Sequence, residues 1–520
     1  MRPWQRIAIF TAGLVALVGG GIGVVAGTGT SSGIGTTTTT TLPVTTTRIG
    51  GGGGTPCQYC AYYAGFTNGF PSVNTWFPIG VFDAGGNPGT GGNVPMGCSN
   101  QGCQMQKEGL NFLVQADNGP PSQALVTSTI NNFCTYGIYG ILWHNVTTSG
   151  SEPVSLMQNG ANAANAGCAK YLAGYQIGDE DCSASEVTTI NAVLAADRTR
   201  MANLGESSGN TTDSTCYTTQ NASSLISGDT YPVLNPYEGS VCLIPNAQSD
   251  CLWLYGVQTA RYVFHDTSNH PVFVDIDPGT TAKQFSGSGC NTTTNQCPPG
   301  NEAYMTPEQV NSSVWETLIN RANGVLYFCP DNYNSGSDAC LGGGASGNPA
   351  NCNLISSGFA NNCIIPGNLT WIDAQVASYA VALNAPNDGY CRMISAAIGG
   401  TANFSPPYTT CSGGDLTVST SNTNEPVVAM TRKVGSSIYL FTMADKANGT
   451  TTVTYTISDA HNQTATLIYD SAQHYNPGSY NDRGNTFPLN GSGVFTDTLT
   501  GDTGNAANAI SYQVKIYAIS

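Results

Sequence analysis

The chain is 520 residues long, and 40% of its residues are hydrophobic, so it can bury a large core and we expect one large domain with a smaller one. Only 9% of residues are charged, and acidic residues outnumber basic ones by 32 to 16. This balance argues against a protein that binds nucleic acid.

The N-terminal segment is typical of an exported protein. Arg2 and Arg6 precede an uncharged stretch, residues 7–27, which is long enough to cross a bilayer as a helix. Residues 1–27 are therefore interpreted as a signal peptide or a transmembrane anchor, and both alternatives stay open. Residues 28–69 begin with a run of Thr, Gly and Ser and are interpreted as a disordered stalk or linker that leads into the first domain. Either alternative predicts an extracellular protein, which is secreted or tethered to the outer face of the plasma membrane.

The cysteines point to the same compartment. All 18 precede residue 412, and an even number in an exported chain predicts disulfide bonds. The close pairs that could each close a loop are Cys57 and Cys60, Cys98 and Cys103, Cys290 and Cys297, and Cys352 and Cys363. A zinc site at Cys57 and Cys60 is the alternative, but no second Cys-x-x-Cys or His pair completes it.

Eight apolar or mixed runs, each ending in a polar or aromatic residue, are predicted as strands. They cover residues 76–83, 109–117, 136–144, 171–180, 231–238, 252–258, 271–277 and 324–331. Helical patterns lie between them: one follows a capping box at Ser183 and carries apolar residues as far as Leu204, and another begins at Thr306 and Pro307. This alternation predicts an α/β protein with a (β/α)8 TIM barrel over residues 70–400. An open doubly wound sheet is the alternative, although the glycine fingerprint of its nucleotide-binding form is missing.

Cysteine disappears after residue 411, and short β-rich stretches take over. They cover residues 426–431, 437–443, 450–457, 465–469, 493–499 and 511–519. These stretches predict a small all-β sandwich over residues 412–520, with the junction between Pro386 and Asp415. In the last stretch, alternation from Tyr512 to Tyr517 predicts a half-exposed strand.

The fourth predicted strand ends in a cluster of acids. Asp179 and Glu180 follow an apolar run, and barrel enzymes carry their chemistry at the C-terminal ends of the strands. These two acids are therefore the first candidates for an active site, and the alternative is that they only cap and solubilise a loop. His144 ends the third predicted strand; substrate contact and a purely structural hydrogen bond both fit it.

Several motifs resemble those of clan A glycoside hydrolases, including β-galactosidase-like members. They are residues 76–82, the Gly-Asp-Glu that ends the fourth strand, residues 306–310 with Trp315, residues 324–328, and residues 494–499 with the final strand. The resemblance extends from about residue 70 to the C-terminus and implies a (β/α)8 barrel followed by a β-sandwich. It also implies an oligosaccharide or polysaccharide as substrate, and no metal or organic cofactor is required.

The resemblance implies that Glu180 is the general acid/base and that a carboxylate near the end of the seventh strand is its partner. Asp277 is the candidate for that partner, with Glu302 and Glu238 as alternatives. The chain departs from the clan in having Asp179 where Asn is usual and Asp277 where Glu is usual. An inverting mechanism tolerates the shorter Asp277 better than a retaining one, because its two carboxyl groups lie farther apart.

Sugars offer apolar faces ringed by hydroxyl groups, so a glycan site needs aromatic platforms with amide and carboxylate partners. The candidates at or beside predicted strand ends are Gln115, His144, Asp179, Asn235, Tyr237 and Tyr255. For the aromatic residues, burial in the barrel wall is the alternative. A second hypothesis is a catalytically inactive barrel that binds glycans or serves as a structural cell-surface protein.

Overall fold

In the computed structural model of the chain, eight parallel strands close into a barrel and two antiparallel sheets follow. The structure describes residues 57–83, 101–115, 122–143, 152–178, 184–206, 222–230, 252–265, 269–276, 307–329, 367–393, 411, 414–422, 425–445, 449–472, 484–501 and 512–520. In these ranges no helix combines the length and the apolar character needed to span a membrane. The segment at residues 7–27 lies outside them.

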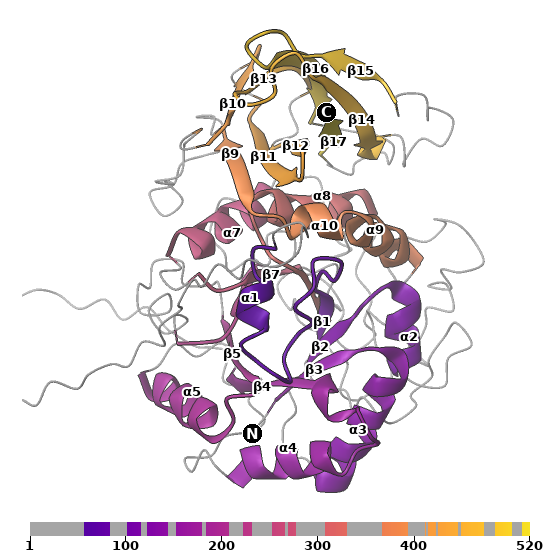
Figure 1. Cartoon of the computed structure of the whole chain (residues 1–520), viewed down its shortest axis with the longest axis vertical. Coiled ribbons are helices and arrows are strands. Elements are labelled where there is room, and N and C mark those ends of the chain that lie inside the picture. Colours follow the sequence, from indigo (N-terminus) through magenta and orange to yellow (C-terminus); the bar gives the residue numbers. More distant parts are fainter. Residues whose placement is uncertain are drawn as a thin grey trace, which may run out of the picture. The chain divides into compact units, whose positions relative to one another are not determined.

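The barrel strands follow one another in chain order around the closed sheet, and β1 pairs with β8 to complete it (Figure 1). They are β1 (Ile79–Asp83), β2 (Phe112–Gln115), β3 (Tyr139–Trp143), β4 (Leu172–Gly178), β5 (Met201–Glu206), β6 (Ile226–Thr230), β7 (Val272–Ile276) and β8 (Val325–Cys329).

Helices alternate with these strands. They are α2 (Gln101–Glu108), α3 (Gln123–Tyr136), α4 (Glu152–Asn162), the 3₁₀ turn η2 (Ala169–Tyr171), α5 (Ala184–Ala196), α7 (Trp253–His265), α8 (Pro307–Ile319), α9 (Gly367–Ser378) and α10 (Ala380–Leu383). The predicted (β/α)8 barrel is therefore confirmed, and the doubly wound alternative is wrong because the sheet closes on itself.

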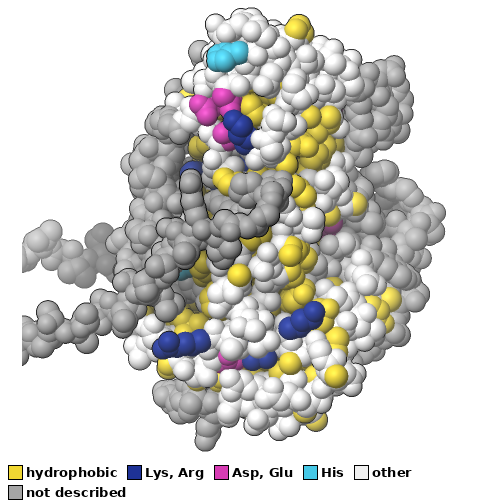
Figure 2. All heavy atoms as spheres, in the orientation of Figure 1, with side chains coloured by type: hydrophobic (Ala, Val, Ile, Leu, Met, Phe, Trp, Pro, Cys, Tyr) yellow, Lys and Arg dark blue, Asp and Glu magenta, His cyan; other side chains and the backbone are white. Residues whose placement is uncertain are grey.

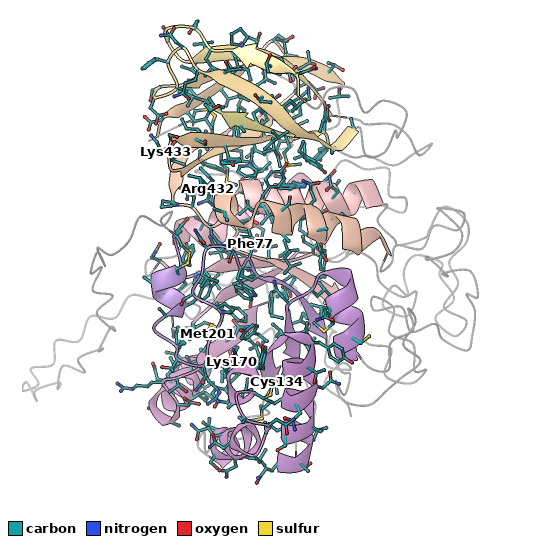
Figure 3. The ribbon with its side chains drawn as sticks, turned by 45° about the vertical axis from the view of Figure 1, so that its right-hand side comes forward. Phe77, Cys134, Lys170, Met201, Arg432 and Lys433 are labelled. Atoms are coloured by element: carbon teal, nitrogen blue, oxygen red, sulfur yellow. A yellow bond between two sulfur atoms is a disulfide. The ribbon has the colours of Figure 1, made fainter. Side chains whose placement is uncertain are left out.

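Alternation along the strands divides the core in two. In β7, Val272, Val274 and Ile276 belong to the cluster that packs under the helices. Phe273 belongs instead to a second cluster inside the barrel. Met201 of β5, labelled in Figure 3, belongs to the same cluster. Successive side chains of a strand point to opposite faces, so the parity of a residue tells which side of the barrel wall it faces.

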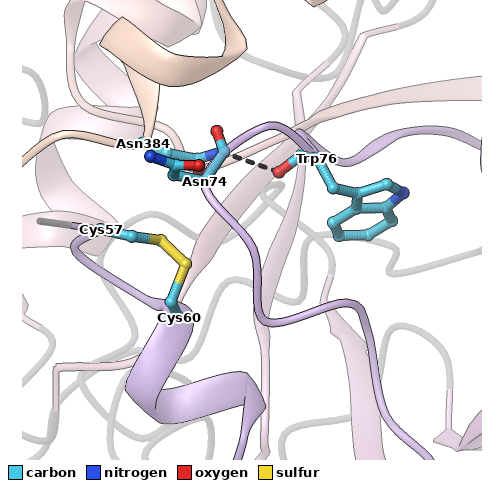
Figure 4. The surroundings of a disulfide bond; sticks show 5 residues. All are labelled: Cys57, Cys60, Asn74, Trp76 and Asn384. Carbon is cyan, nitrogen blue, oxygen red and sulfur yellow. Dashed lines mark hydrogen bonds between the residues drawn. A yellow bond between two sulfur atoms is a disulfide. The ribbon is translucent and has the colours of Figure 1, made fainter. Parts of the chain in front are cut away.

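Aromatic residues close the N-terminal end of the barrel. The short helix α1 (Cys60–Tyr63) carries Tyr63 into the inner cluster, and Phe70 packs on Phe112 with 5.2 Å between ring centroids. The Cys57–Cys60 disulfide precedes this plug, so the predicted pairing is confirmed and the zinc alternative is wrong. Asn384 lies beside it and donates a hydrogen bond to the Trp76 carbonyl at 2.7 Å (Figure 4).

The C-terminal part contains a three-stranded sheet, β10-β13-β16, and a six-stranded sheet, β15-β14-β17-β12-β11-β9. The strands are β9 (Asn387–Arg392), β10 (Leu416–Thr420), β11 (Val427–Val434), β12 (Ser437–Ala444), β13 (Thr450–Ile457), β14 (Thr464–Asp470), β15 (Thr486–Pro488), β16 (Val494–Thr500) and β17 (Val514–Ile519). Tyr517 of one sheet packs against Tyr455 and Phe495 of the other, with ring centroids 6.1 and 5.3 Å apart, which makes a sandwich. Because β9 belongs to this sandwich, the sheet begins before residue 412.

Helix α8 of the barrel packs on the sandwich. Trp315 is fully buried and stacks on Phe441 of β12, with 5.9 Å between the ring centroids. Ser312 accepts a hydrogen bond of 2.9 Å from the backbone N–H of Tyr512. An apolar contact and a backbone hydrogen bond together attach the two domains at this helix.

Two element predictions are wrong. Residues 252–258 were expected to form a strand, but α7 begins at Trp253. The buried residues Tyr255 and Tyr262 of this helix, together with Leu252 just before it, follow helical spacing. A short apolar run cannot be assigned from periodicity alone. The helix expected to continue to Leu204 ends at Ala196, and β5 takes up the rest. The run at residues 231–238 lies outside the described residues.

Few charged side chains appear on the face of the molecule shown in Figure 2, in keeping with the composition. Several charged groups are instead buried, among them Asp197, Arg200, Asp275, Glu316, Asp373, Arg392, Arg432 and Asp445. A buried charge must be paired, hydrogen-bonded or neutralised, so these residues determine much of the local structure.

Candidate active site

The expected catalytic acids directly follow two described barrel strands. β4 ends at Gly178, immediately before Asp179 and Glu180, and β7 ends at Ile276, immediately before Asp277. All three acids lie outside the described residues, as do His144, Asn235 and Tyr237. The candidate site is therefore built from the strand segments that lead to them.

A row of polar side chains crosses the inner wall of the barrel just below these strand ends. The Asn203 amide of β5 donates to Gln176 Oε1 of β4 at 2.7 Å and to Ser227 Oγ of β6 at 3.4 Å. Gln176 in turn donates to the Gly178 carbonyl at 2.7 Å, and Ser227 donates to the Leu204 carbonyl at 3.2 Å. These bonds tie three neighbouring strands together at one level of the barrel.

Asp275 of β7 extends this row. It lies two residues after Phe273, which faces the barrel interior, and its side chain is 3% exposed. Alternation therefore puts Asp275 on the inner face. We refer to Gln176, Asn203, Ser227 and Asp275 as the polar arc; it occupies β4 to β7.

The opposite part of the inner wall is apolar. Phe82 of β1, Val114 of β2 and Ile141 of β3 are buried and belong to the inner cluster. The inner wall thus has an apolar side and a side rich in amide, hydroxyl and carboxylate groups. The four residues of the polar arc are at most 5% exposed, so they belong to the packed interior just below the strand ends, where barrels of this kind carry their active sites.

Two of the expected binding residues can be placed. Gln115 is the last residue of β2 and is in register with Asp83 of β1 and Leu142 of β3, at the C-terminal end of the barrel as expected. Tyr255 was expected at a strand end, but it lies in α7 and is fully buried under the helices. The reason for assigning Tyr255 to the site is therefore gone.

The structure adds two carboxylate residues to the candidates. Glu206 is the last residue of β5 and is in register with Gly228, and Asp229 of β6 is in register with Asp275 of β7. The signal in the sequence was an acid at the end of a strand. The strand that ends at Glu206 was not predicted, because a helix was expected to continue to Leu204.

A hydrogen-bonded carboxylate fixes the N-terminal ends of β4 and β5. Asp197 accepts bonds from Tyr175 Oη at 2.6 Å and from Arg200 Nη1 at 2.8 Å. Burial opposes its ionisation, yet hydrogen bonds from Thr199, Tyr175 and Arg200 hold its pKa well below the ordinary value. Burial and the bond to Asp197 raise the pKa of Tyr175, so this phenol stays neutral. These contacts thereby fix β4 and β5 at their N-terminal ends, opposite the end that leads to the candidate site.

One group of acids has the spacing of a metal site. The carboxylates of Asp388, Asp415 and Asp459 lie within 4.8 Å of one another in the sandwich. Lys433 forms an ion pair with Asp459, and burial together with the Asp459 charge raises the pKa of Asp388. The lysine thus offsets part of the negative charge of the three acids.

Comparisons with known proteins give only distant similarities. No family model matches the sequence, and no curated protein matches it. Similar solved structures include AmyP in complex with maltose, with TM-score 0.42 and 9% identity over 88% of this chain and 97% of that one. They also include Amy13B of Eubacterium rectale, with TM-score 0.44 and 7% identity over 87% and 98%. A third is a GH27 β-L-arabinopyranosidase from Geobacillus stearothermophilus in complex with arabinose, with TM-score 0.41 and 10% identity over 84% and 98%.

Similarities at this level carry no argument about activity. The architecture rests on the topology of the chain itself, a closed parallel eight-stranded barrel followed by antiparallel sheets. That architecture is the one implied by the resemblance to clan A glycoside hydrolases, and it is confirmed. A barrel of this kind hosts many chemistries, so function has to be argued from the site.

Proposed function

We propose that the protein is an extracellular glycoside hydrolase that cleaves oligosaccharides or polysaccharides with a pair of carboxyl groups. The observation that carries this proposal is the polar arc. It lies on the inner face of β4 to β7, directly below the positions where β4 leads to Glu180 and β7 leads to Asp277. Disulfides such as Cys134–Cys168 support the location outside the cell.

In the proposed reaction, Glu180 protonates the glycosidic oxygen and Asp277 acts on the anomeric carbon, directly or through a water. Gln176, Asn203 and Ser227, which are bonded to one another and to the backbone, would hold the ends of β4 to β6 in place beneath the site. Asp179, beside the acid, would raise the pKa of Glu180 by like-charge repulsion. Asp229 is the alternative second carboxylate because it lies beside Asp275 in the register.

The test is hydrolysis of a broad panel of aryl glycosides and polysaccharides by the full chain. We expect Glu180→Gln to lower turnover by at least about a hundredfold, since a positioned acid/base contributes roughly 10²–10⁴-fold. Glu108→Gln is the matched control, because Glu108 ends α2 at the opposite end of the barrel and should leave turnover unchanged.

Comparison of Asp277→Asn with Asp229→Asn identifies the second carboxylate, and the anomer first released shows whether the reaction retains or inverts configuration. If the folded wild-type protein turns over nothing on the panel, the hydrolase proposal fails. Binding of a glycan without turnover would then favour the inactive-barrel hypothesis, which the shorter Asp277 in place of Glu also suggests.

A further inference from the structure

Two carboxyl groups converge on one guanidinium where helix α8 meets the sandwich. Arg392 Nη2 of β9 lies 3.1 Å from Glu316 Oε1 of α8 and 2.8 Å from Asp445 Oδ2, which follows β12. All three side chains are at most 1% exposed. The barrel contributes one acid to this cluster, and the sandwich contributes the other acid and the base.

The cluster is surrounded by neutral hydrogen-bonding groups. Asn320 Oδ1 accepts from Arg392 Nη1 at 2.9 Å and from Tyr390 Oη at 2.6 Å, and Asn320 Nδ2 donates to Glu316 Oε1 at 3.2 Å. Helix α7 presents Gly256, which has no side chain, directly over Glu316 and Arg392.

Within the described parts of the chain, few charged or titratable groups act on this cluster. They are Glu316, Asp445, Arg392, Tyr390 and Arg321, whose guanidinium lies 4.8 Å from the Tyr390 ring centre. Burial raises the pKa of Tyr390 to about 12, so it remains a neutral phenol at ordinary pH. Burial opposes the charge on Arg392, but Asp445 and Glu316 outweigh it and raise the pKa of the guanidinium.

The charges do not balance if both acids are ionised. Among the described residues, Arg392 is the cation that pairs with these two acids, whereas Arg321 lies against the Tyr390 ring. Two carboxylates and this one guanidinium leave a net negative charge in a site without solvent, which is costly. One proton shared between the acids removes that charge and supplies a hydrogen bond between them. Burial, and next the charge of Asp445, hold the pKa of Glu316 well above its usual range, despite the opposing effect of Arg392.

We propose that a buried proton stabilises the contact between helix α8 of the barrel and the sandwich. In the folded protein Glu316 is protonated and donates a hydrogen bond to Asp445, so that this contact, the joint between the two domains, is most stable at acidic pH. Arg392 then pairs with Asp445 alone and holds the Glu316 carbonyl oxygen as a neutral acceptor. A rise in pH weakens this joint because the folded protein must either keep a proton that the unfolded chain has lost or bury a second negative charge.

The sign of the pH dependence follows from linkage. In the unfolded chain Glu316 ionises near its ordinary value of 4.5, whereas the folded protein keeps the proton to a much higher pH. Between these two values folding takes up one proton, and the folding equilibrium constant falls about tenfold per pH unit through this group. Below the pKa of Glu316 in the unfolded chain, its contribution to stability is fully present. Above its pKa in the folded protein, that contribution is lost.

The experiment is urea unfolding of the full chain at a series of pH values from about 4 to about 9. In Glu316→Gln, folding should no longer take up this proton. As pH rises, the folding constant of the variant should therefore increase relative to that of the wild type, by up to about tenfold per pH unit. Asp445→Asn should have a similar effect on the slope, because Arg392 can then neutralise an ionised Glu316. Glu108→Gln should keep the wild-type slope.

An unchanged slope in Glu316→Gln, with weaker folding at every pH, would show that both acids are ionised and would overturn the proposal. If the variants do not fold, hydrogen exchange of the wild type decides. After correction for intrinsic rates, protection of α8 and β9 should fall between about pH 5 and about pH 8 more than protection of β2 and β3. An equal change in all four elements would also overturn it.

Discussion

The glycine at position 256 shows how one missing side chain makes room for a buried charge cluster. A Cβ built there would collide with Glu316 Oε1 and with Asn320 Nδ2, both of which are fixed by partners. Helix propensity alone would favour alanine at this position by about 1 kcal/mol. The close approach explains why glycine occupies this position in the first turn of α7 in spite of that preference.

We expect Gly256→Ala to lower the free energy of unfolding by about 1–3 kcal/mol, because the cluster must move or lose bonds to admit the methyl group. Denaturant unfolding at one pH measures the change. Gly435→Asn is the control, since Gly435 has a φ of +62° with nothing within 4 Å and asparagine tolerates that conformation. Equal losses in both variants would show that the collision at Gly256 is not the cause.

At the scale of elements, the Cys134–Cys168 disulfide joins the last turn of α3 to the residue before η2 and β4. It closes a loop with a sequence separation of 34, whereas the separation is 3 for Cys57–Cys60. The chain gains conformational entropy on unfolding, and the longer loop reduces this gain more than the shorter one does.

Replacement of both Cys134 and Cys168 by alanine should therefore lower the free energy of unfolding by about 3–4 kcal/mol. The same replacement of Cys57 and Cys60 should cost clearly less. Thermal unfolding of the two double variants under non-reducing conditions gives the comparison. A larger loss for the Cys57–Cys60 variant would indicate that packing of the plug, and not loop closure, dominates.

The sequence predicted most barrel strands because each is a short apolar run that ends at a polar residue. Six of the eight predicted runs contain a barrel strand, the first at residues 79–83 and the last at residues 325–329. β5 was missed because Met201 and Leu204 happen to continue the helical spacing of α5. The Asx turn at Asp197, which accepts from Thr199 N at 2.9 Å, was the overlooked signal for the end of that helix.

The last strand shows a different limit of pattern reading. Gln513 and Lys515 alternate with apolar residues and predicted a half-exposed strand, yet both are at most 7% exposed. β17 lies between β14 and β12, and Lys515 donates to Asp497 Oδ2 at 2.8 Å. A sequence pattern cannot reveal that a polar residue has a partner on another strand, so burial was underestimated.

The candidate site was predictable only in outline. The strand ends gave Asp179, Glu180 and Asp277 without any knowledge of contacts, and those residues stay predictions. The polar arc joins β4 to β7 through residues as far apart in the chain as Gln176 and Asp275, and no local pattern signals such an arrangement. Glu206 and Asp229 became candidates only once β5 and β6 were assigned.

At the scale of the whole molecule, attachment of the sandwich depends on Trp315. This side chain is fully buried and contacts Tyr379 and Tyr469 as well as Phe441. Trp315→Ala should lower the free energy of unfolding by about 3–5 kcal/mol through the lost burial and the cavity left behind. Trp315→Phe, which keeps a ring, should lose less. Calorimetry of both variants tests this, and a loss confined to the barrel would contradict an attachment role.

The aromatic plug closes one end of the barrel and so limits the direction from which a ligand could approach. Tyr59, Tyr63 and Phe70 fill the space between the first residues of the strands, so the lumen is sealed at that end. A polymer cannot thread through the protein. If the protein is the hydrolase proposed above, a glycan must therefore approach from the other end, where β4 leads to Glu180 and β7 leads to Asp277, and a long chain must lie across that end.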